Sequence, residues 1–275
     1  MPLLPLLSQR YPATSKGEVF VRIFDRVPLK SVPANLITCG GLLLGVSAIG
    51  YAFSGQPEMA AWFIAICALV DKLDGTVARL LNATSDFGIQ MDSFSDLITF
   101  GVAPACMVWN AAAQLDAGMW GSEGSVIGLP GSLILGLLCA SYVVSAALRL
   151  AKFNVTTAEH PRMFHGLPTT LAGGLTSTLY LTAIELGFDQ HAMMKVFPLL
   201  LALCAGLMVS NLPLPKLRKA NSKVFFAGQL VLGVAVYVLI PLRMAFWVPL
   251  AVLVGYVSIG FPLGIRATIR AEADA

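Results

Sequence analysis

Charged residues divide this sequence into long uncharged runs that are mostly apolar. Seven runs of 19 to 27 residues contain no Asp, Glu, Lys or Arg: 31–57, 97–115, 124–148, 163–184, 196–215, 224–242 and 244–265. A helix needs about 20 apolar residues to cross the hydrocarbon core of a membrane, so each run can form or contribute to a span. No ten-residue alternation of polar and apolar positions recurs, which argues against membrane-spanning strands.

Two predicted helices carry acids within their apolar length. An eighth helix, from about Met59 to Leu81, begins apolar and then includes four charged residues: Asp71, Lys72, Asp74 and Arg79. The helix containing 97–115 begins near Gly88 and therefore includes Asp92 and Asp96. The pattern predicts eight membrane helices in an all-α polytopic fold.

The composition agrees with a membrane protein. Apolar residues make up 57% and charged residues 12% of the 275 positions, and the mean hydropathy is +0.78. An ordinary soluble domain has roughly 45–50% apolar and 25% charged residues. These values exclude disordered, collagen-like, secreted disulfide-rich and nucleic-acid-binding classes. The five cysteines all lie in apolar stretches without CxxC spacing, which indicates buried apolar side chains rather than a metal site or disulfide framework.

The distribution of basic residues predicts the topology. With the N-terminus in the cytoplasm, 16 of the 18 Lys and Arg residues fall on or near the cytoplasmic side, and only Lys195 and Arg243 lie near the outer face. This is a positive-inside pattern with both chain ends inside. Residues 1–32 are predicted to include an amphipathic helix on the membrane surface, with Val19, Phe20, Ile23 and Phe24 facing lipid. The alternative is a signal peptide, but early prolines interrupt its apolar core.

The acids of the two charged helices recur on matching faces. On the first helix, four residues recur at +3, +4 and +7: Asp71, Asp74, Gly75 and Ala78. On the second helix, three residues recur at +4 and +8: Gly88, Asp92 and Asp96. The short link between these helices makes them antiparallel neighbours. Four carboxylates are therefore expected to meet near the cytoplasmic end of the bundle.

Such a cluster has two interpretations. Inserting one Asp at the centre of a membrane helix costs about 2.5–3.5 kcal/mol, so four acids need a cause. The acids can instead lie in interfacial water and pair with Lys72 and Arg79. The interpretation we favour is a site for divalent cations, since hard oxygen ligands without nearby His or Cys suit Mg²⁺ or Mn²⁺. Two ions about 3.5–4 Å apart can clamp a phosphoryl group during displacement.

The string D-x-x-D-G-x-x-A-R-x8-G-x-x-x-D-x-x-x-D, which runs from Asp71 to Asp96, resembles the signature of the CDP-alcohol phosphotransferases. The resemblance implies a six-helix core followed here by two further C-terminal helices. It implies that two divalent cations, Mg²⁺ or Mn²⁺, are held by Asp71, Asp74, Asp92 and Asp96, and that Asp96 takes the proton of the acceptor hydroxyl. It also implies a set of residues that bind the nucleotide and its phosphates: Asn35, Thr38, Gly75, Ala78, Arg79 and Gly88.

Within this family, segments 100–105, 148–155 and 164–169 resemble those of the bacterial phosphatidylserine synthases, with Lys152 where arginine is usual. The resemblance implies CDP-diacylglycerol and L-serine as substrates, a homodimer, contact with membrane lipids, and a place in the bacterial inner membrane with the active site facing the cytoplasm. Four residues are candidates to bind the serine carboxylate or a lipid phosphate: Arg149, Lys152, Arg162 and His165. Lys152 and Arg162 can equally be ordinary positive-inside anchors.

The resulting hypothesis is a transferase that moves the phosphatidyl group of CDP-diacylglycerol to the hydroxyl of L-serine. One alternative keeps the chemistry with choline, glycerol phosphate or an inositol phosphate as acceptor. Another is a cation-coupled transporter, which predicts acids spread across the membrane and inverted repeats rather than one two-helix cluster. The expected organisation is an interfacial segment (1–32), a catalytic membrane domain (33–215) and two additional helices with a tail (216–275).

Overall fold

The computed structural model describes residues 29–82, 85–115, 118–120, 124–156, 163–215 and 223–273. The surface helix expected within residues 1–32 lies almost wholly outside these residues. The described helices are η1 (Leu29–Ser31), α3 (Val32–Phe53), α4 (Pro57–Leu80), α5 (Asp86–Asp96), η2 (Leu97–Val102), α6 (Ala103–Gln114), η3 (Gly118–Trp120), α7 (Gly131–Thr156), α8 (Thr169–Glu185), α9 (Gln190–Val209), α10 (Lys223–Leu239) and α11 (Trp247–Ala273). The described strands are β1 (Ser125–Val126), β2 (Leu129–Pro130), β3 (Met163–His165) and β4 (Pro213–Pro215).

Each predicted span corresponds to a helix among the described residues, with α5, η2 and α6 forming one continuous segment. Five helices are long and apolar enough to cross a membrane: α3, the segment Asp86–Gln114, α7, α9 and α11. Helix α4 carries charged residues through its second half, and α8 and α10 have 17 residues each. The all-α, multi-pass membrane fold is confirmed, while the count of eight spans stays a prediction.

The helices do not end where the uncharged runs end. Helix α7 continues past Arg149 and Lys152 to Thr156, because long basic side chains extend toward water from the end of a membrane helix. Two small antiparallel pairs were not predicted: β1 with β2 between α6 and α7, and β3 with β4 beside the end of α9. In β4 the Pro213-Leu-Pro sequence cannot continue the helix that precedes it.

The interior is built from small side chains. Helix α3 packs along α4 through residues such as Ala48, Ala52, Ala61 and Ala65, which are at most 1% exposed. Large apolar side chains of α3 instead face outward, and Leu43 is 68% exposed. Small residues at helix contacts and large apolar residues outside are typical of membrane bundles, where lipid covers the outer surface.

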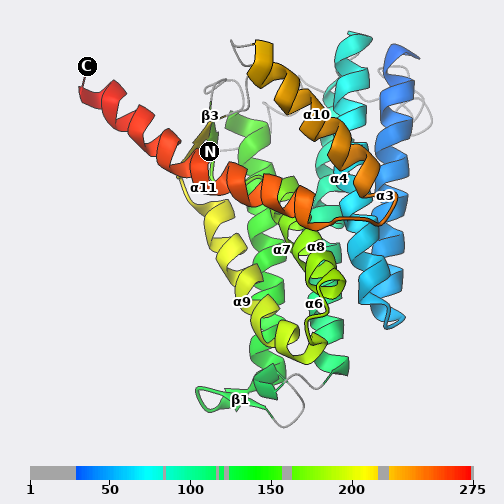
Figure 1. Ribbon diagram of the computed structural model, residues 1–275, viewed down its shortest axis with the longest axis vertical. Coiled ribbons are helices and arrows are strands. Elements are labelled where there is room, and N and C mark those ends of the chain that lie inside the picture. The colour runs from blue at the N-terminus through cyan, green and yellow to red at the C-terminus, as the bar shows by residue number, and fades with distance from the viewer. Residues whose placement is uncertain are drawn as a thin grey trace, which may run out of the picture.

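Helices α10 and α11 are joined by a short turn into a helical hairpin; α11 packs on α8 and β4 and runs obliquely across the other helices in Figure 1. The Trp62 indole N–H donates to the Ile240 carbonyl at 2.8 Å, and the Arg243 guanidinium lies 4.4 Å from the Trp62 ring centre. The Glu185 carboxylate of α8 accepts the backbone N–H groups of Ala245 and Phe246, just before α11 begins. The hairpin is therefore fixed at its turn.

Candidate functional site

The second half of α4 and the second half of α5 form the two sides of the site. Helix α4 ends at Leu80, and Asn82 follows in a left-handed conformation with φ 48°. Helix α5 begins at Asp86, where the Ser85 hydroxyl accepts the Gly88 backbone N–H at 3.1 Å as an N-cap. This short connection turns the chain back and brings the two acidic faces together, as predicted.

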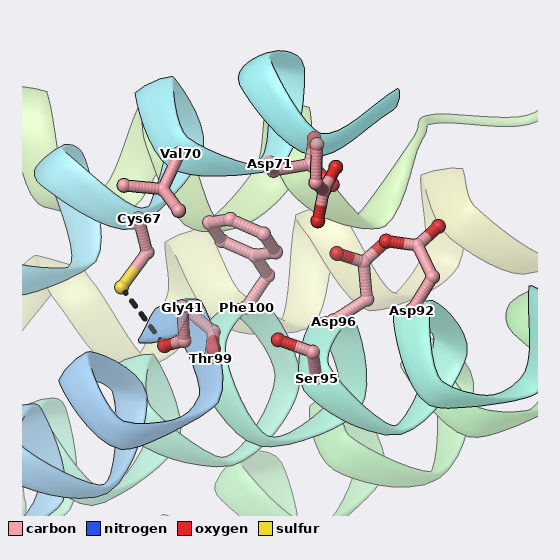
Figure 2. Close-up of a pocket in the computed structure, with 10 residues that line it drawn as sticks. Gly41, Cys67, Val70, Asp71, Asp92, Ser95, Asp96, Thr99 and Phe100 are labelled. Atoms are coloured by element: carbon pink, nitrogen blue, oxygen red, sulfur yellow. Dashed lines mark hydrogen bonds between the residues drawn. The ribbon is translucent and has the colours of Figure 1, made fainter. Parts of the chain in front are cut away.

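Three of the predicted metal ligands form one cluster. Carboxylate oxygens of Asp71 and Asp74, from α4, and of Asp92, from α5, all lie within 4.8 Å of one another. Figure 2 shows Asp71 pointing from α4 toward Asp92 and Asp96, which rise from the facing helix. Asp96 is buried, with 9% of its surface exposed, and its carboxyl is within hydrogen-bonding reach of Asp71. The structure thus brings all four predicted acids together in the lining of one pocket.

Neighbouring groups hold Asp74 in place. The Thr38 hydroxyl, from α3, donates to Asp74 Oδ2 at 2.8 Å, and the Gly75 backbone N–H donates to Asp74 Oδ1. Both Asp74 and Thr38 are buried. Because each carboxylate oxygen accepts one hydrogen bond, the orientation of Asp74 is fixed before any ligand arrives.

A pocket continues from the acids into the bundle. Below the carboxylates it is lined by Gly41, Cys67, Ser95, Thr99 and Phe100. The Cys67 thiol donates to the Gly41 carbonyl at 3.5 Å, the contact dashed in Figure 2. The Thr99 hydroxyl is buried and has no hydrogen-bond partner among the residues that the structure describes. The buried part of the pocket therefore contains a hydroxyl, that of Thr99, whose hydrogen-bonding capacity is not used within the described residues.

Arg149 of α7 is buried beside the acids. Its guanidinium donates to the Thr169 hydroxyl at 3.2 Å and lies 5.3 Å from the centre of the Phe153 ring. It also interacts electrostatically with Asp96 and Asp71. A cation at this position offsets part of the negative charge of the cluster, and its fork of N–H groups suits a carboxylate or phosphate.

Five of the six residues predicted to bind the nucleotide lie around the mouth of the cluster, whereas the sixth, Thr38, is buried and donates to Asp74. Asn35 approaches Gly88 so closely that a Cβ on the glycine would lie 3.1 Å from Asn35 Oδ1. Gly75 is exposed, and a Cβ there would meet no atom within 4 Å. Ala78 and the exposed Arg79 follow on the next turn of α4. This part of α4 is open to a ligand.

The other basic candidates have different positions. Lys152 is exposed, and its ammonium donates to the Asn211 side chain at 2.6 Å. Arg162 lies outside the described residues. His165 belongs to β3, where its backbone is paired with Pro213, and the structure does not describe its side chain.

Two polar contacts of the site were not predicted. Asn154 of α7 donates to Ser93, the neighbour of Asp92, at 2.9 Å, and Thr169 of α8 accepts from Arg149. Asn154 lies in a segment that the family resemblance singled out, but a lone asparagine is too common to interpret by itself. Thr169 also lies in such a segment, 164–169, but its role depends on a contact between two helices.

The donor set fits a hard divalent cation. Asp71, Asp74 and Asp92 supply carboxylate oxygens, and neither His nor Cys belongs to this group among the described residues. Mg²⁺ and Mn²⁺ prefer such oxygen ligands and keep open positions for water and phosphate. The geometry therefore supports a metal site that also receives a phosphorylated ligand.

Comparison with known proteins agrees with a metal site that receives a phosphorylated ligand. The family model described as CDP-alcohol phosphatidyltransferase matches residues 31–210. A CDP-diacylglycerol–serine O-phosphatidyltransferase of Helicobacter pylori is 34% identical over 241 residues, covering 86% of this chain and 91% of the relative. A protein of the same name from Bacillus subtilis is 33% identical, over 70% of this chain and 96% of the relative. One from Mycobacterium leprae is 29% identical, over 77% of this chain and 67% of the relative.

Proposed function

This chain belongs to the CDP-alcohol phosphatidyltransferase family, and we propose that it transfers the phosphatidyl group of CDP-diacylglycerol to the hydroxyl of L-serine. In this reaction the serine oxygen forms a bond to the phosphorus that carries diacylglycerol. The bond from that phosphorus to CMP breaks, and CMP leaves. The names of relatives that are similar over most of the chain support serine as the acceptor.

The convergence of four carboxylates from α4 and α5 is the observation that carries this proposal. Asp71, Asp74, Asp92 and Asp96 would hold two divalent cations, Mg²⁺ or Mn²⁺. The cations supply positive charge that neutralises the pyrophosphate and the charge that develops during transfer. The chain's own part is to hold these oxygens in place, through Thr38 and Gly75 at Asp74 and through the contact between Asp71 and Asp96.

We assign Asp96 as the base that takes the proton of the serine hydroxyl. It is buried, and it interacts electrostatically with Arg149. A carboxylate within hydrogen-bonding reach of the attacking hydroxyl can accept its proton. The Arg149 guanidinium would bind the serine carboxylate or the lipid phosphate and so bring the substrate to Asp96.

The nucleotide would lie along the open part of α4. Gly75 and Ala78 leave room for it, Arg79 would contact its phosphates, and Asn35 and Gly88 would face it across the mouth of the site. The open face of α4 supports this placement of the nucleotide.

Lys152, Arg162 and His165 remain candidates for contact with acceptor or lipid headgroups.

The proposal extends to the organisation of the molecule. We take residues 33–215 as the catalytic domain, flanked by 1–32 and 216–275, and the family match over 31–210 supports these limits. We place the protein in the bacterial inner membrane as a homodimer, with the acidic site facing the cytoplasm.

An acceptor-swap assay tests the function. Purified protein in detergent–lipid micelles receives CDP-diacylglycerol, Mn²⁺ or Mg²⁺, and labelled L-serine, choline, glycerol phosphate or inositol phosphate. We expect label in lipid, with equal CMP release, only for serine and only when a divalent cation is present. Transfer to another acceptor would reject serine and retain the chemistry, whereas no metal-dependent CMP release with any acceptor would reject both.

A further inference from the structure

A single stretch of π-helix follows Asp96 directly. In this stretch, η2 (Leu97–Val102), the backbone N–H of Ala103 bonds to the Ile98 carbonyl, five residues earlier rather than four. Such turns are rare inside helices and often occur at functional sites. Here the π-turn joins the acid-bearing helix α5 to the buried helix α6.

Pro104 explains why a carbonyl of this turn needs another donor. In a regular α-helix the Phe100 carbonyl would accept the backbone N–H of residue 104, but proline has none. The Tyr142 hydroxyl of α7 donates to the Phe100 carbonyl instead, at 2.8 Å. Tyr142 is fully buried, with 0% exposure, so water cannot replace its hydroxyl.

The turn is packed closely by three neighbouring helices. A Cβ at Gly45 of α3 would lie 2.4 Å from the Thr99 hydroxyl oxygen, and one at Gly173 of α8 would lie 2.9 Å from Phe100. Gly101 approaches Ala146 of α7, where a Cβ would lie 3.2 Å away. These close contacts hold the π-turn at one position in the core. A shift of the turn would require α3, α7 or α8 to move, whereas a change in its hydrogen bonding would not.

We infer that Tyr142 is a positioning residue for the acidic site: its hydroxyl satisfies the Phe100 carbonyl, maintains the π-turn, and so sets the direction in which Asp92 and Asp96 point. One residue of an α-helix corresponds to a rotation of about 100°. Loss of the extra residue of the π-turn would therefore turn the face of α5 away from Asp71 and Asp74. This inference rests on the proposed metal site.

The experiment measures Mn²⁺ binding to the full-length protein in nanodiscs by electron paramagnetic resonance, with activity recorded in parallel. Three variants are compared with the parent: Tyr142→Phe, Pro104→Ala and the double variant. Tyr180→Phe is the matched control, because Tyr180 is also a buried tyrosine, at 1% exposure, and packs against Phe197. Leaving a buried carbonyl unpaired is costly, so we expect Tyr142→Phe to weaken Mn²⁺ binding about tenfold. We expect Tyr180→Phe to change it less than about twofold.

The double variant separates positioning from general packing. In the Pro104→Ala background the Phe100 carbonyl has a backbone N–H to accept, so adding Tyr142→Phe should weaken Mn²⁺ binding by less than about twofold. Equal losses with and without Pro104 would overturn the inference. If Tyr142→Phe does not fold, recovery of folding and Mn²⁺ binding in the double variant supports the inference, and failure of both variants overturns it.

Asp92→Asn separates this inference from the proposed function. If the parent binds Mn²⁺, Asp92→Asn does not, and Tyr142→Phe binds as the parent does, the metal site stands and the role of Tyr142 is rejected. If the parent itself does not bind Mn²⁺, the proposed metal site and the inference built on it are both rejected.

Discussion

Asp96 is the residue on which the proposed chemistry depends most. It is buried and interacts electrostatically with Asp71 and Arg149, and its replacement by Asn removes a proton acceptor while keeping nearly the same shape. We expect Asp96→Asn to lower the rate of CMP release by about 10²- to 10⁴-fold, the usual contribution of a general base. CDP-diacylglycerol binding, measured by equilibrium titration, should stay within a few-fold of the parent.

Asp86→Asn is the control for this variant. Asp86 lies in the first turn of the same helix and is exposed, outside the acidic cluster. It should retain nearly full turnover. Full activity of Asp96→Asn would remove the assignment of Asp96 as base, and loss of lipid binding in that variant would identify Asp96 as a binding residue instead.

Thr38 tests whether the orientation of a metal ligand matters. Its hydroxyl donates to Asp74 Oδ2 at 2.8 Å. Outer-shell partners of this kind change metal affinity about 10- to 100-fold when removed. We therefore expect Thr38→Ala to raise the Mn²⁺ concentration required for half-maximal activity about tenfold, while Thr38→Ser, which keeps the hydroxyl, stays near the parent. Equal behaviour of the two variants would show that this hydrogen bond does not affect metal binding.

Arg149 tests the substrate side of the site. Its guanidinium contacts Thr169 and lies near Asp96 and Asp71. Hydrogen bonds to charged groups contribute about 1.5–3 kcal/mol. We expect Arg149→Lys, which keeps the charge and loses the planar fork, to raise the KM for L-serine about tenfold or more. A rise confined to the KM for CDP-diacylglycerol would assign the guanidinium to the lipid phosphate, and unchanged constants for both substrates would remove it from the site.

At the scale of elements, the turn between α10 and α11 is fixed by one carboxylate. Glu185 accepts two backbone N–H groups before α11, at 2.9 and 2.8 Å, as an N-terminal cap would. Loss of a helix cap costs about 1 kcal/mol. We expect Glu185→Ala to lower the midpoint of thermal unfolding in detergent by a few degrees and to make the 240–246 turn more sensitive to protease.

Glu58→Ala is the comparison for this prediction. Glu58 is also an acid near the same end of the bundle, in the first turn of α4, and it does not bond to the 240–246 turn among the described residues. Glu58→Ala should leave the protease sensitivity of the 240–246 turn unchanged. Equal sensitivity of both variants would show that Glu185 does not hold the hairpin.

The helices could be predicted because their signals are local. Long uncharged runs correspond to α3, α7 and α9, and the spacing of Asp71, Asp74, Asp92 and Asp96 correctly placed four carboxylates together. The π-turn could not be predicted in this way. Pro104 removes a donor, which is visible in the sequence, but the replacement donor comes from Tyr142, 42 residues away from its acceptor Phe100. Such contacts depend on how the helices pack.

At the scale of the whole molecule, the distribution of charge relates the site to one side of the membrane. The acidic cluster lies between the second halves of α4 and α5, and the end of α4 lies at the same end of the bundle as the start of α3 and the end of α7 (Figure 1). Among the residues that the structure describes, Lys30, Lys72, Arg79 and Lys152 belong to segments at this end. By the positive-inside rule, this distribution of charge supports the proposed cytoplasmic orientation of the acidic site.

Epitope accessibility tests this orientation. The β1–β2 hairpin lies at the opposite end of the bundle in Figure 1, and Ile127 at its tip is 95% exposed, so a short epitope inserted after Gly128 should be tolerated. We expect antibody to reach this epitope in intact spheroplasts and to reach an epitope placed after Ala275 only in inside-out vesicles. CDP-diacylglycerol-dependent activity of each tagged protein shows that it is folded. The reverse pattern of accessibility in an active protein would place the acidic site on the outer face, because this site lies at the end of the bundle opposite to the β1–β2 hairpin.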